Sequence, residues 1–273
     1  EIKIKILYKI LLKLLSRQKN FILNKILMIL ADNLLYKSRQ SYNKINLLED
    51  VEIKIFSQNG EDGILDYLIT QMGLKKPNFI EIGVEDYSEA NTRYIYEKYF
   101  SSGLIIDRLE NLEDQVKSNI NFWKGDIRVL EENITSENVS EKITNNCDFE
   151  VDILSLDIDG IDYWVLKNIP EALSPKIYII EYNSIFGDEL EVTVPNIKNF
   201  SRESYHHSRT CYGASLRAYI NLMDKKGYYL IGVNRLRNNA FFILKKYKKE
   251  IYFKNIHELS LKEATNYLFR ESR

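Results

Sequence analysis

The sequence predicts an α/β protein whose mostly parallel sheet is closed by a C-terminal antiparallel hairpin and preceded by an N-terminal helical arm. From residue 50 onward, short apolar runs alternate with polar segments of helical pattern, as in α/β folds. Most of these runs are apolar on both faces, which is typical of central parallel strands. Near the end, two such runs flank a turn-rich segment and indicate a hairpin.

Residues 1–49 are expected to form a basic amphipathic arm. Residues 1–45 contain ten Lys or Arg against Glu1 and Asp32, in a chain whose formal net charge is −1. Basic residues recur at every fourth position: Lys5, Lys9, Lys13 and Arg17. A second helix is expected over residues 21–35. The arm would pack on the main domain or on a second subunit, or it would lie on an anionic membrane surface.

The composition of the sequence indicates where in the cell the protein is located and which classes of partner it binds. No stretch reaches the roughly 18 uncharged apolar residues of a membrane span, and no secretory cleavage pattern is found. Cys147 and Cys211 are too few for a disulfide framework. Outside the arm the chain is acidic, which argues against nucleic acid as a partner. We expect a cytoplasmic protein, or one at the inner membrane surface, with a homo-oligomer as a further expectation.

The main domain is expected over residues 50–247, followed by a basic tail over 248–273 with a short helix at 261–268. Expected parallel strands are residues 78–83, 103–107, 120–123, 151–156 and 176–180, with hairpin strands at 228–233 and 240–244. Expected helices are residues 60–72, 89–99, 111–119, 162–168 and 214–226. Asn238 and Asn239 are expected in the hairpin turn.

Acidic residues recur where the expected strands end. They are Glu81, Asp107, Asp126, Asp157 with Asp159, and Glu181 followed by Asn183. Ligands of open parallel sheets bind at these carboxyl ends. Carboxylates accept from ribose hydroxyls and pair with ammonium groups, a combination that S-adenosylmethionine offers. The loop over residues 83–88 has one glycine, which disfavours a pyrophosphate cofactor.

Five sequence blocks resemble the class I S-adenosylmethionine-dependent methyltransferases. In order they are FIEIGVEDYSEANTRYI, GLIID, FWKGDI, SLDIDGIDYWVLKNI and YIIEYNS, and the last two are similar to the FkbM-type branch. The resemblance covers roughly residues 55–245 and implies a Rossmann-like sheet and S-adenosylmethionine as cofactor. The sequence departs from the family at Asp86 and Tyr87, where a second or third glycine is usual.

The resemblance also implies roles for particular residues. Glu81 and Gly83 would border the methionine part, Asp107 would hold the ribose hydroxyls, and Asp126 with Ile127 would meet the adenine. Asn91 and Thr92 belong to the first block and would also contact the cofactor. A polar cluster before the first strand resembles a block of related methyltransferases and would touch the amino-acid end: Ser57, Gln58, Asn59, Glu61 and Asp62. Alternatively, this cluster is only a helix N-terminus with first-turn acids.

The chemistry needs a base or a metal ion near the acceptor. Asp157, Asp159, Glu181 and Asn183 form a set of oxygen ligands that would hold Mg²⁺ or Mn²⁺ and lower the pKa of an acceptor hydroxyl. Alternatively, Asp159 and Asp162 cap the following helix. Asp157, or His206 or His207 in a polar loop, would serve as general base.

Three functions of different class remain open. The first is an O-methyltransferase acting on a small or carbohydrate-like acceptor, in surface-glycan, capsule, polysaccharide or secondary-metabolite assembly. The second is a metal-dependent glycosyltransferase that uses Asp157 and Asp159 as its Asp-x-Asp motif. The third is a non-catalytic protein that interacts with a membrane surface through its arm.

Overall fold

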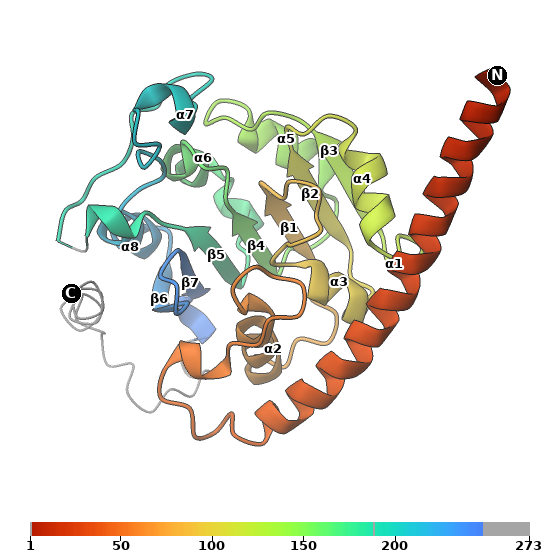
Figure 1. Cartoon of the computed structure of the whole chain (residues 1–273). Helices are drawn as coiled ribbons and strands as arrows, with labels where there is room; N and C mark the ends of the chain where they lie inside the picture. Colours follow the sequence, from red (N-terminus) through yellow and green to blue (C-terminus); the bar gives the residue numbers. More distant parts are fainter. Residues whose placement is uncertain (1, 188, 248–273) are drawn as a thin grey trace.

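A computed structural model describes the chain from residue 2 to residue 247 except residue 188, with side chains from residue 20 onward. The tail expected over 248–273, with its short helix, lies outside the described residues. Figure 1 shows a twisted sheet between two layers of helices, with a long N-terminal helix along one side.

The sheet has seven strands in the order β3-β2-β1-β4-β5-β7-β6. Their bounds are β1 Phe79–Ile82, β2 Gly103–Asp107, β3 Ile127–Glu131, β4 Ile153–Leu156, β5 Ile177–Glu181, β6 Tyr228–Val233 and β7 Asn239–Leu244. Strands β1 to β5 are parallel, whereas β7 runs antiparallel between β5 and β6. The expected fold class, a Rossmann-like sheet with an antiparallel C-terminal hairpin and an N-terminal helix, is confirmed.

Helices cover both faces of this sheet. Their bounds are α1 Ile2–Arg39, α2 Glu61–Gln71, α3 Arg93–Tyr99, α4 Leu112–Asn119, α5 Val139–Asn146, α6 Asp162–Asn168, α7 Arg202–Tyr205 and α8 Leu216–Lys225. Helices α1 to α4 share one core with alternate strand residues such as Ile177 and Ile179. Helices α5, α6 and α8 share the other core with Tyr178 and Ile180. The alternation follows from the two-residue period of a strand.

Local signals explain where several helices begin. Ser215 precedes α8, and its side chain accepts a hydrogen bond from the backbone N–H of Ala218. Asp162 opens α6 and accepts from the N–H groups of Ile158 and Gly160, so it organises the turn between β4 and this helix. The helix expected over residues 162–168 is found with these same bounds.

The third strand was misplaced by the sequence pattern. Residues 120–123 form an irregular segment, and the chain enters the sheet only at Ile127. Ile120 is buried without being in a strand, and Trp123 is exposed. The true β3 is an edge strand that is only half-buried and contains Arg128, so it lacks a continuous apolar run. Helix α5 was not expected from the sequence.

The arm forms one continuous helix rather than two. Its second half packs against the domain, where Ala31 and Leu35 are buried in the same core as α2 and α3. The Arg39 guanidinium bonds both carboxylate oxygens of the buried Asp66 in α2. Among the described residues, no helix has the length and apolar character that a membrane span requires.

Candidate functional site

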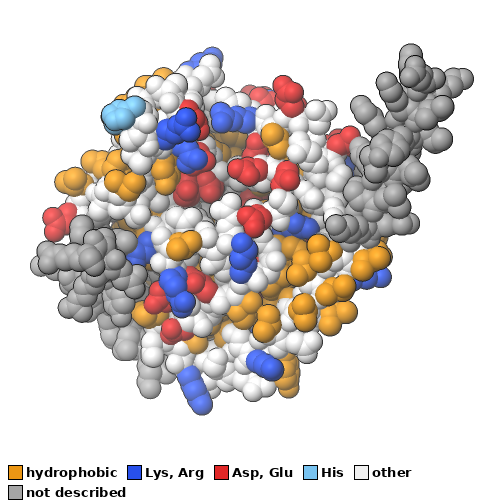
Figure 2. Space-filling model, in the orientation of Figure 1, with side chains coloured by type: hydrophobic (Ala, Val, Ile, Leu, Met, Phe, Trp, Pro, Cys, Tyr) orange, Lys and Arg blue, Asp and Glu red, His pale blue; other side chains and the backbone are white. Residues whose placement is uncertain are grey.

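A cavity of about 670 Å³ opens at the carboxyl ends of the parallel strands. It lies at the neighbouring strands β1 and β4, from which the strand order runs in opposite directions. Such a switch point is where open α/β sheets bind ligands, and the volume suits a small molecule. The acidic residues that line it are Glu81, Glu85, Glu89, Asp107, Glu132, Asp157, Asp159 and Glu181. Figure 2 shows acidic side chains gathered in this hollow.

Glu81 organises the loop that follows β1. One carboxylate oxygen accepts from the backbone N–H of Asn91 at 2.8 Å, and the other accepts from the N–H and the hydroxyl of Thr92. Burial raises the pKa of Glu81 to about 7. Asn91 also donates from its amide to the hydroxyl of Ser155 in β4. Glu81 therefore fixes the loop at the wall of the cavity, while Asn91 ties it to the next strand.

The loop keeps left-handed backbone conformations without the usual glycines. Gly83 has φ +83°, and Glu85 and Tyr87 have φ of +49° and +63°. Such angles are costly for side-chain-bearing residues. Asp86, which the sequence marked as a departure, is not among the residues of positive φ. The buried Tyr87 holds the loop through a 2.8 Å hydrogen bond with the Thr92 hydroxyl.

Asp107 joins the end of β2 to the same loop. Its Oδ2 accepts from the N–H groups of Val84 at 2.7 Å and Glu85 at 2.9 Å. Its Oδ1 accepts from the N–H of Leu109 at 2.9 Å. A carboxylate oxygen has two lone pairs, so Oδ1 retains capacity for one more donor. Asp107 lines the cavity and can accept one ligand hydroxyl in this arrangement.

Asp126 and Ile127 do not lie at the carboxyl end of a strand. Ile127 begins β3, so both residues lie at the opposite edge of the sheet, where the Asp126 carbonyl accepts from Gly103 at the start of β2. Neither residue lines the cavity, so the structure does not support the adenine contact that the resemblance implied for them. The residue that follows β3 into the cavity is Glu132, which pairs with Lys142 at 2.6 Å. Sequence reasoning missed it because the strand was misplaced.

Within the polar cluster before β1, only Gln58 lines the cavity. Asp62 is buried, and its Oδ2 accepts from the N–H groups of residues 55–57 and from the Ser57 hydroxyl. Burial raises the pKa of Asp62 to about 6. Glu61 accepts from the N–H of Asn59 and from two asparagine side chains near β7. This geometry favours the interpretation of Ser57, Asn59, Glu61 and Asp62 as the ordered start of α2.

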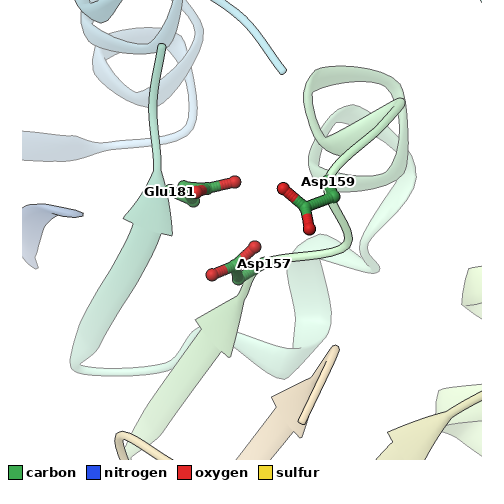
Figure 3. Close-up of side chains that lie close together, drawn as sticks. All are labelled: Asp157, Asp159 and Glu181. Carbon is green, nitrogen blue, oxygen red and sulfur yellow. The ribbon is translucent and has the colours of Figure 1, made fainter. Parts of the chain in front are cut away.

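Three carboxylates converge at the ends of β4 and β5 (Figure 3). Asp157 and Asp159 follow β4, Glu181 ends β5, and oxygen atoms of the three lie within 4.8 Å of one another. Burial raises the pKa of Asp157 and of Glu181, and the charge of Asp157 raises that of Glu181 further. The two buried carboxyl groups lie close together, and burial with their mutual repulsion favours a proton held by the pair. Asp159 is paired with Arg202 of α7.

Asn183 does not join this carboxylate group in the structure. It is fully buried, and its amide nitrogen donates to the carbonyl oxygens of Thr210 at 2.7 Å and Tyr212 at 3.1 Å. Its amide oxygen accepts from the N–H of Ile185. Asn183 does not line the cavity, so its expected role as a fourth metal ligand is not supported by this geometry.

The two candidate catalytic histidines lie outside the cavity. His206 and His207 are exposed and stack on each other with ring centroids 4.1 Å apart. His206 is also hydrogen-bonded to the Ser208 hydroxyl at 2.7 Å. Arg202, at the start of α7, lines the cavity, whereas the histidines follow the end of this one-turn helix. The expectation that either is the general base is therefore not supported.

Asn239 is a cavity residue that the sequence placed in a turn. It begins β7 and stands opposite Glu181 in the antiparallel ladder. Its amide nitrogen donates to Glu61 at 2.8 Å, and its buried Oδ1 has no hydrogen-bond partner among the described residues. Glu181 Oε2 is likewise buried and unpartnered within the described chain. No local sequence signal distinguishes Asn239 from its neighbour Asn238.

The sheet order and the cavity define a Rossmann-like α/β protein with a polar cavity at the carboxyl ends of its strands. No protein-family model and no curated protein matches the sequence. Among solved structures, the chain is similar to an O-methyltransferase family protein from Burkholderia thailandensis, with 11% identity and a TM-score of 0.39. That match covers 67% of this chain and 58% of the other, so this chain spans less than two thirds of that protein's length.

Two further solved structures show a similar degree of likeness. One is an S-adenosylmethionine-dependent methyltransferase from Clostridium acetobutylicum, with 11% identity and a TM-score of 0.42 over 67% of this chain and 90% of that chain. The other is an O-methyltransferase from Bacillus cereus in complex with SAH, with 16% identity and a TM-score of 0.38 over 64% and 76%. These TM-scores are too low to support an argument. The assignment of the fold therefore rests on the strand order of this chain.

Proposed function

We propose that this chain is an S-adenosylmethionine-dependent O-methyltransferase that acts on a hydroxyl of a small or carbohydrate-like acceptor. The observation that carries the proposal is the single cavity in which carboxylates of four strand ends converge: Glu81, Asp107, Asp157 and Glu181. S-adenosylmethionine carries a sulfonium, an ammonium and ribose hydroxyls, and carboxylates attract or accept from each of these groups. A phosphate-bearing cofactor would instead be repelled by the same side chains.

The cofactor would occupy the half of the cavity between the ends of β1 and β2. Gly83 lines this half of the cavity, and Asp107 has acceptor capacity for a ribose hydroxyl. Gln58 lines the same cavity from the segment before α2 and would reach the amino-acid end. Asp126 and Ile127 take no part in this arrangement, because they lie at the other edge of the sheet.

The acceptor would occupy the half near β4 and β5. Methyl transfer is an in-line displacement, so the enzyme must align the hydroxyl and remove its proton. Asp157 lines the cavity, and burial raises its pKa toward the working range of a general base. Phe200 and Arg202 line the same region and would contact the acceptor. In this proposal the acceptor belongs to glycan, capsule or secondary-metabolite assembly in the cytoplasm.

A divalent cation fits the carboxylate group formed by Asp157, Asp159 and Glu181. Carboxylate oxygens are ligands that Mg²⁺ and Mn²⁺ prefer, and Glu181 has a buried oxygen without a hydrogen-bond partner among the described residues. When bound, such an ion would lower the pKa of the acceptor hydroxyl. Arg202 balances Asp159 in the described structure and would have to move aside for all three carboxylates to bind the ion.

The same carboxylate group favours a second candidate, a metal-dependent glycosyltransferase with Asp157 and Asp159 as its Asp-x-Asp motif. That function requires a diphosphate in the cavity. Glu81, Asp107 and Glu132 would then surround the diphosphate with negative charge. Methyl transfer is therefore the better-supported proposal.

Titration calorimetry tests the proposal directly. We expect the chain to bind S-adenosylmethionine and S-adenosylhomocysteine without added metal. Binding of a uridine diphosphate sugar with Mn²⁺, and of neither methyl-donor compound, would replace the proposal by the glycosyltransferase. If none of these ligands binds, methyl transfer is rejected and a non-catalytic interaction protein is favoured.

A further inference from the structure

Helix α1 presents an apolar face to solvent. Six side chains, which we call the α1 outer stripe, are each 48–62% exposed: Ile22, Leu23, Ile26, Ile29, Leu30 and Leu34. The opposite face of the same segment is buried in the domain, with Ala31 and Leu35 in the core. A helix that is apolar on both faces is normally covered on both. Figure 2 shows hydrophobic side chains gathered along the side of the molecule where Figure 1 places α1.

The domain holds α1 in an orientation that keeps this stripe outward. Arg39 near the helix end bonds Asp66, whose side chain is fully buried. Asn24, on the inner face, donates to Glu97 and to the carbonyl oxygen of Asn119, and its own oxygen accepts from Arg93. Rotating α1 to bury the stripe would break these buried hydrogen bonds, which is costly. The stripe is therefore a stable feature of the surface.

Exposed aromatic residues extend the stripe at one end. Trp123 is 62% exposed and Phe122 is 42% exposed. The Trp123 ring lies 5.7 Å from that of Phe21 in α1, and the ammonium of Lys25 lies 4.2 Å from the Phe21 ring centroid. A mainly apolar hollow of about 270 Å³ lies between α1 and this aromatic segment. Trp123 and Lys25 thus contact the same ring, that of Phe21, and both residue types are suited to membrane–water interfaces.

The charge of the arm indicates whether a second copy of the chain or a lipid surface covers the α1 outer stripe. Residues 1–45 carry ten Lys or Arg and two acidic residues. Two copies of the chain joined along α1 would bring like charges together, which opposes association. An anionic lipid surface attracts the same charges, while its acyl region accepts the apolar side chains.

We propose that the α1 outer stripe, together with Phe122 and Trp123, docks on the surface of an anionic lipid bilayer, with α1 lying in the interface plane. The apolar side chains would enter the headgroup and acyl boundary, and the basic residues of the arm would meet anionic headgroups. This proposal is independent of the catalytic function, because none of the residues that carry it lines the cavity at the strand ends.

Vesicle sedimentation with the full chain tests the proposal. We expect binding to vesicles of phosphatidylcholine with phosphatidylglycerol, and much weaker binding to phosphatidylcholine alone or at high salt, because the charge attraction is then absent or screened. A variant with Ile26→Ser, Ile29→Ser and Leu30→Ser should bind about tenfold more weakly or worse, because it loses apolar area that the bilayer would cover. These side chains are exposed, so the variant should fold as the unaltered chain does.

A matched control separates the stripe from exposed apolar residues in general. Ile185, Leu190 and Leu236 are 62–66% exposed on other parts of the surface. Replacing all three by Ser should leave vesicle binding unchanged. Trp123 supplies a second readout, because its fluorescence should shift to shorter wavelength on anionic vesicles and the shift should vanish in Trp123→Phe.

Several results would overturn the proposal. They are failure of the unaltered chain to bind anionic vesicles, equal binding by the stripe variant and the unaltered chain, and an unchanged Trp123 emission on vesicles. Light scattering addresses the competing occupant. A dimer that the stripe variant converts to a monomer, without vesicle binding, would assign this surface to a second copy of the chain instead.

Discussion

A Cβ atom at Gly83 would lie 1.5 Å from the carbonyl oxygen of Asp157. The loops that follow β1 and β4 therefore touch through their backbones at the switch point of the sheet. Gly83 also has φ +83°, a conformation that favours glycine. The contact places the loop that Glu81 organises directly beside the carboxylates at the end of β4.

Gly83→Ala should destabilise the protein by about 2–4 kcal/mol, because it adds a backbone clash to an unfavourable φ. Gly227→Ala is the matched control, since Gly227 has φ +88° with no atom within 4 Å of an added Cβ. The control should lose only about 1 kcal/mol. Urea unfolding measures both values. Equal losses would show that the contact between the two loops is not tight in solution.

Asp107→Asn should weaken S-adenosylmethionine binding at least about tenfold, because it removes a charged acceptor and disturbs its three backbone hydrogen bonds. Asp126→Asn should leave the affinity unchanged, because Asp126 is exposed at the opposite edge of the sheet. Calorimetry compares the two variants with the unaltered chain. An unchanged affinity in Asp107→Asn would reject the ribose assignment, and a loss in Asp126→Asn would restore the adenine assignment.

The Asp157 and Glu181 pair should make the protein less stable as the pH rises. Burial raises both pKa values in the folded chain, whereas unfolded carboxyl groups titrate at about pH 4. The folded state therefore keeps a proton that the unfolded state has lost, so the free energy of unfolding falls from about pH 4 up to the raised pKa. Below that window both states are protonated and the stability is fully present.

Glu181→Gln should reduce this loss by about 1–3 kcal/mol between about pH 5 and pH 8, because the neutral amide cannot repel Asp157. Urea unfolding with a chelator at both pH values measures the difference without interference from divalent ions. Glu137→Gln, at an exposed position, is the control and should behave as the unaltered chain does. Glu81 and Asp62, which titrate in the same window, are common to all three proteins. An identical pH dependence in Glu181→Gln would contradict the shared proton.

Asp66→Asn should destabilise the protein by about 3–5 kcal/mol, because it leaves the Arg39 guanidinium without its buried partner. The hydroxyl groups of Tyr42 and Tyr94 also donate to this carboxylate. Hydrogen exchange should increase along the second half of α1. Glu113→Gln breaks an exposed ion pair with Lys117 and should have no measurable effect. An unchanged free energy of unfolding in Asp66→Asn would mean that the Arg39–Asp66 pair does not hold α1 on the domain.

Regular elements could be predicted where burial makes the sequence periodic. Strands β1, β2, β4 and β5 are buried, and each was found from its apolar run. The edge strand β3 was missed because solvent on one side permits charged residues such as Arg128. The apolar residues at 120–123 belong to an irregular segment instead of a strand. In this segment Ile120 is buried in the core and Trp123 is exposed.

The sequence predicted site residues correctly only where they directly follow a buried strand. Glu81, Asp107, Asp157, Asp159 and Glu181 were identified from their positions after apolar runs, and all five line the cavity. His206 and His207 were chosen for their chemistry, but the chain around α7 directs Arg202 rather than the histidines to the cavity. Asn239 reaches the site only because β7 inserts beside β5.

The sequence by itself determined the layered α/β fold and the row of carboxylates at one edge of its sheet, because strand period and strand-end position are local properties of the chain. Only the tertiary structure decided which of those carboxylates lie together, which accept hydrogen bonds from backbone N–H groups, and which face of α1 stays in solvent. These features depend on distances between segments far apart in sequence, and such distances are set by packing across the whole sheet.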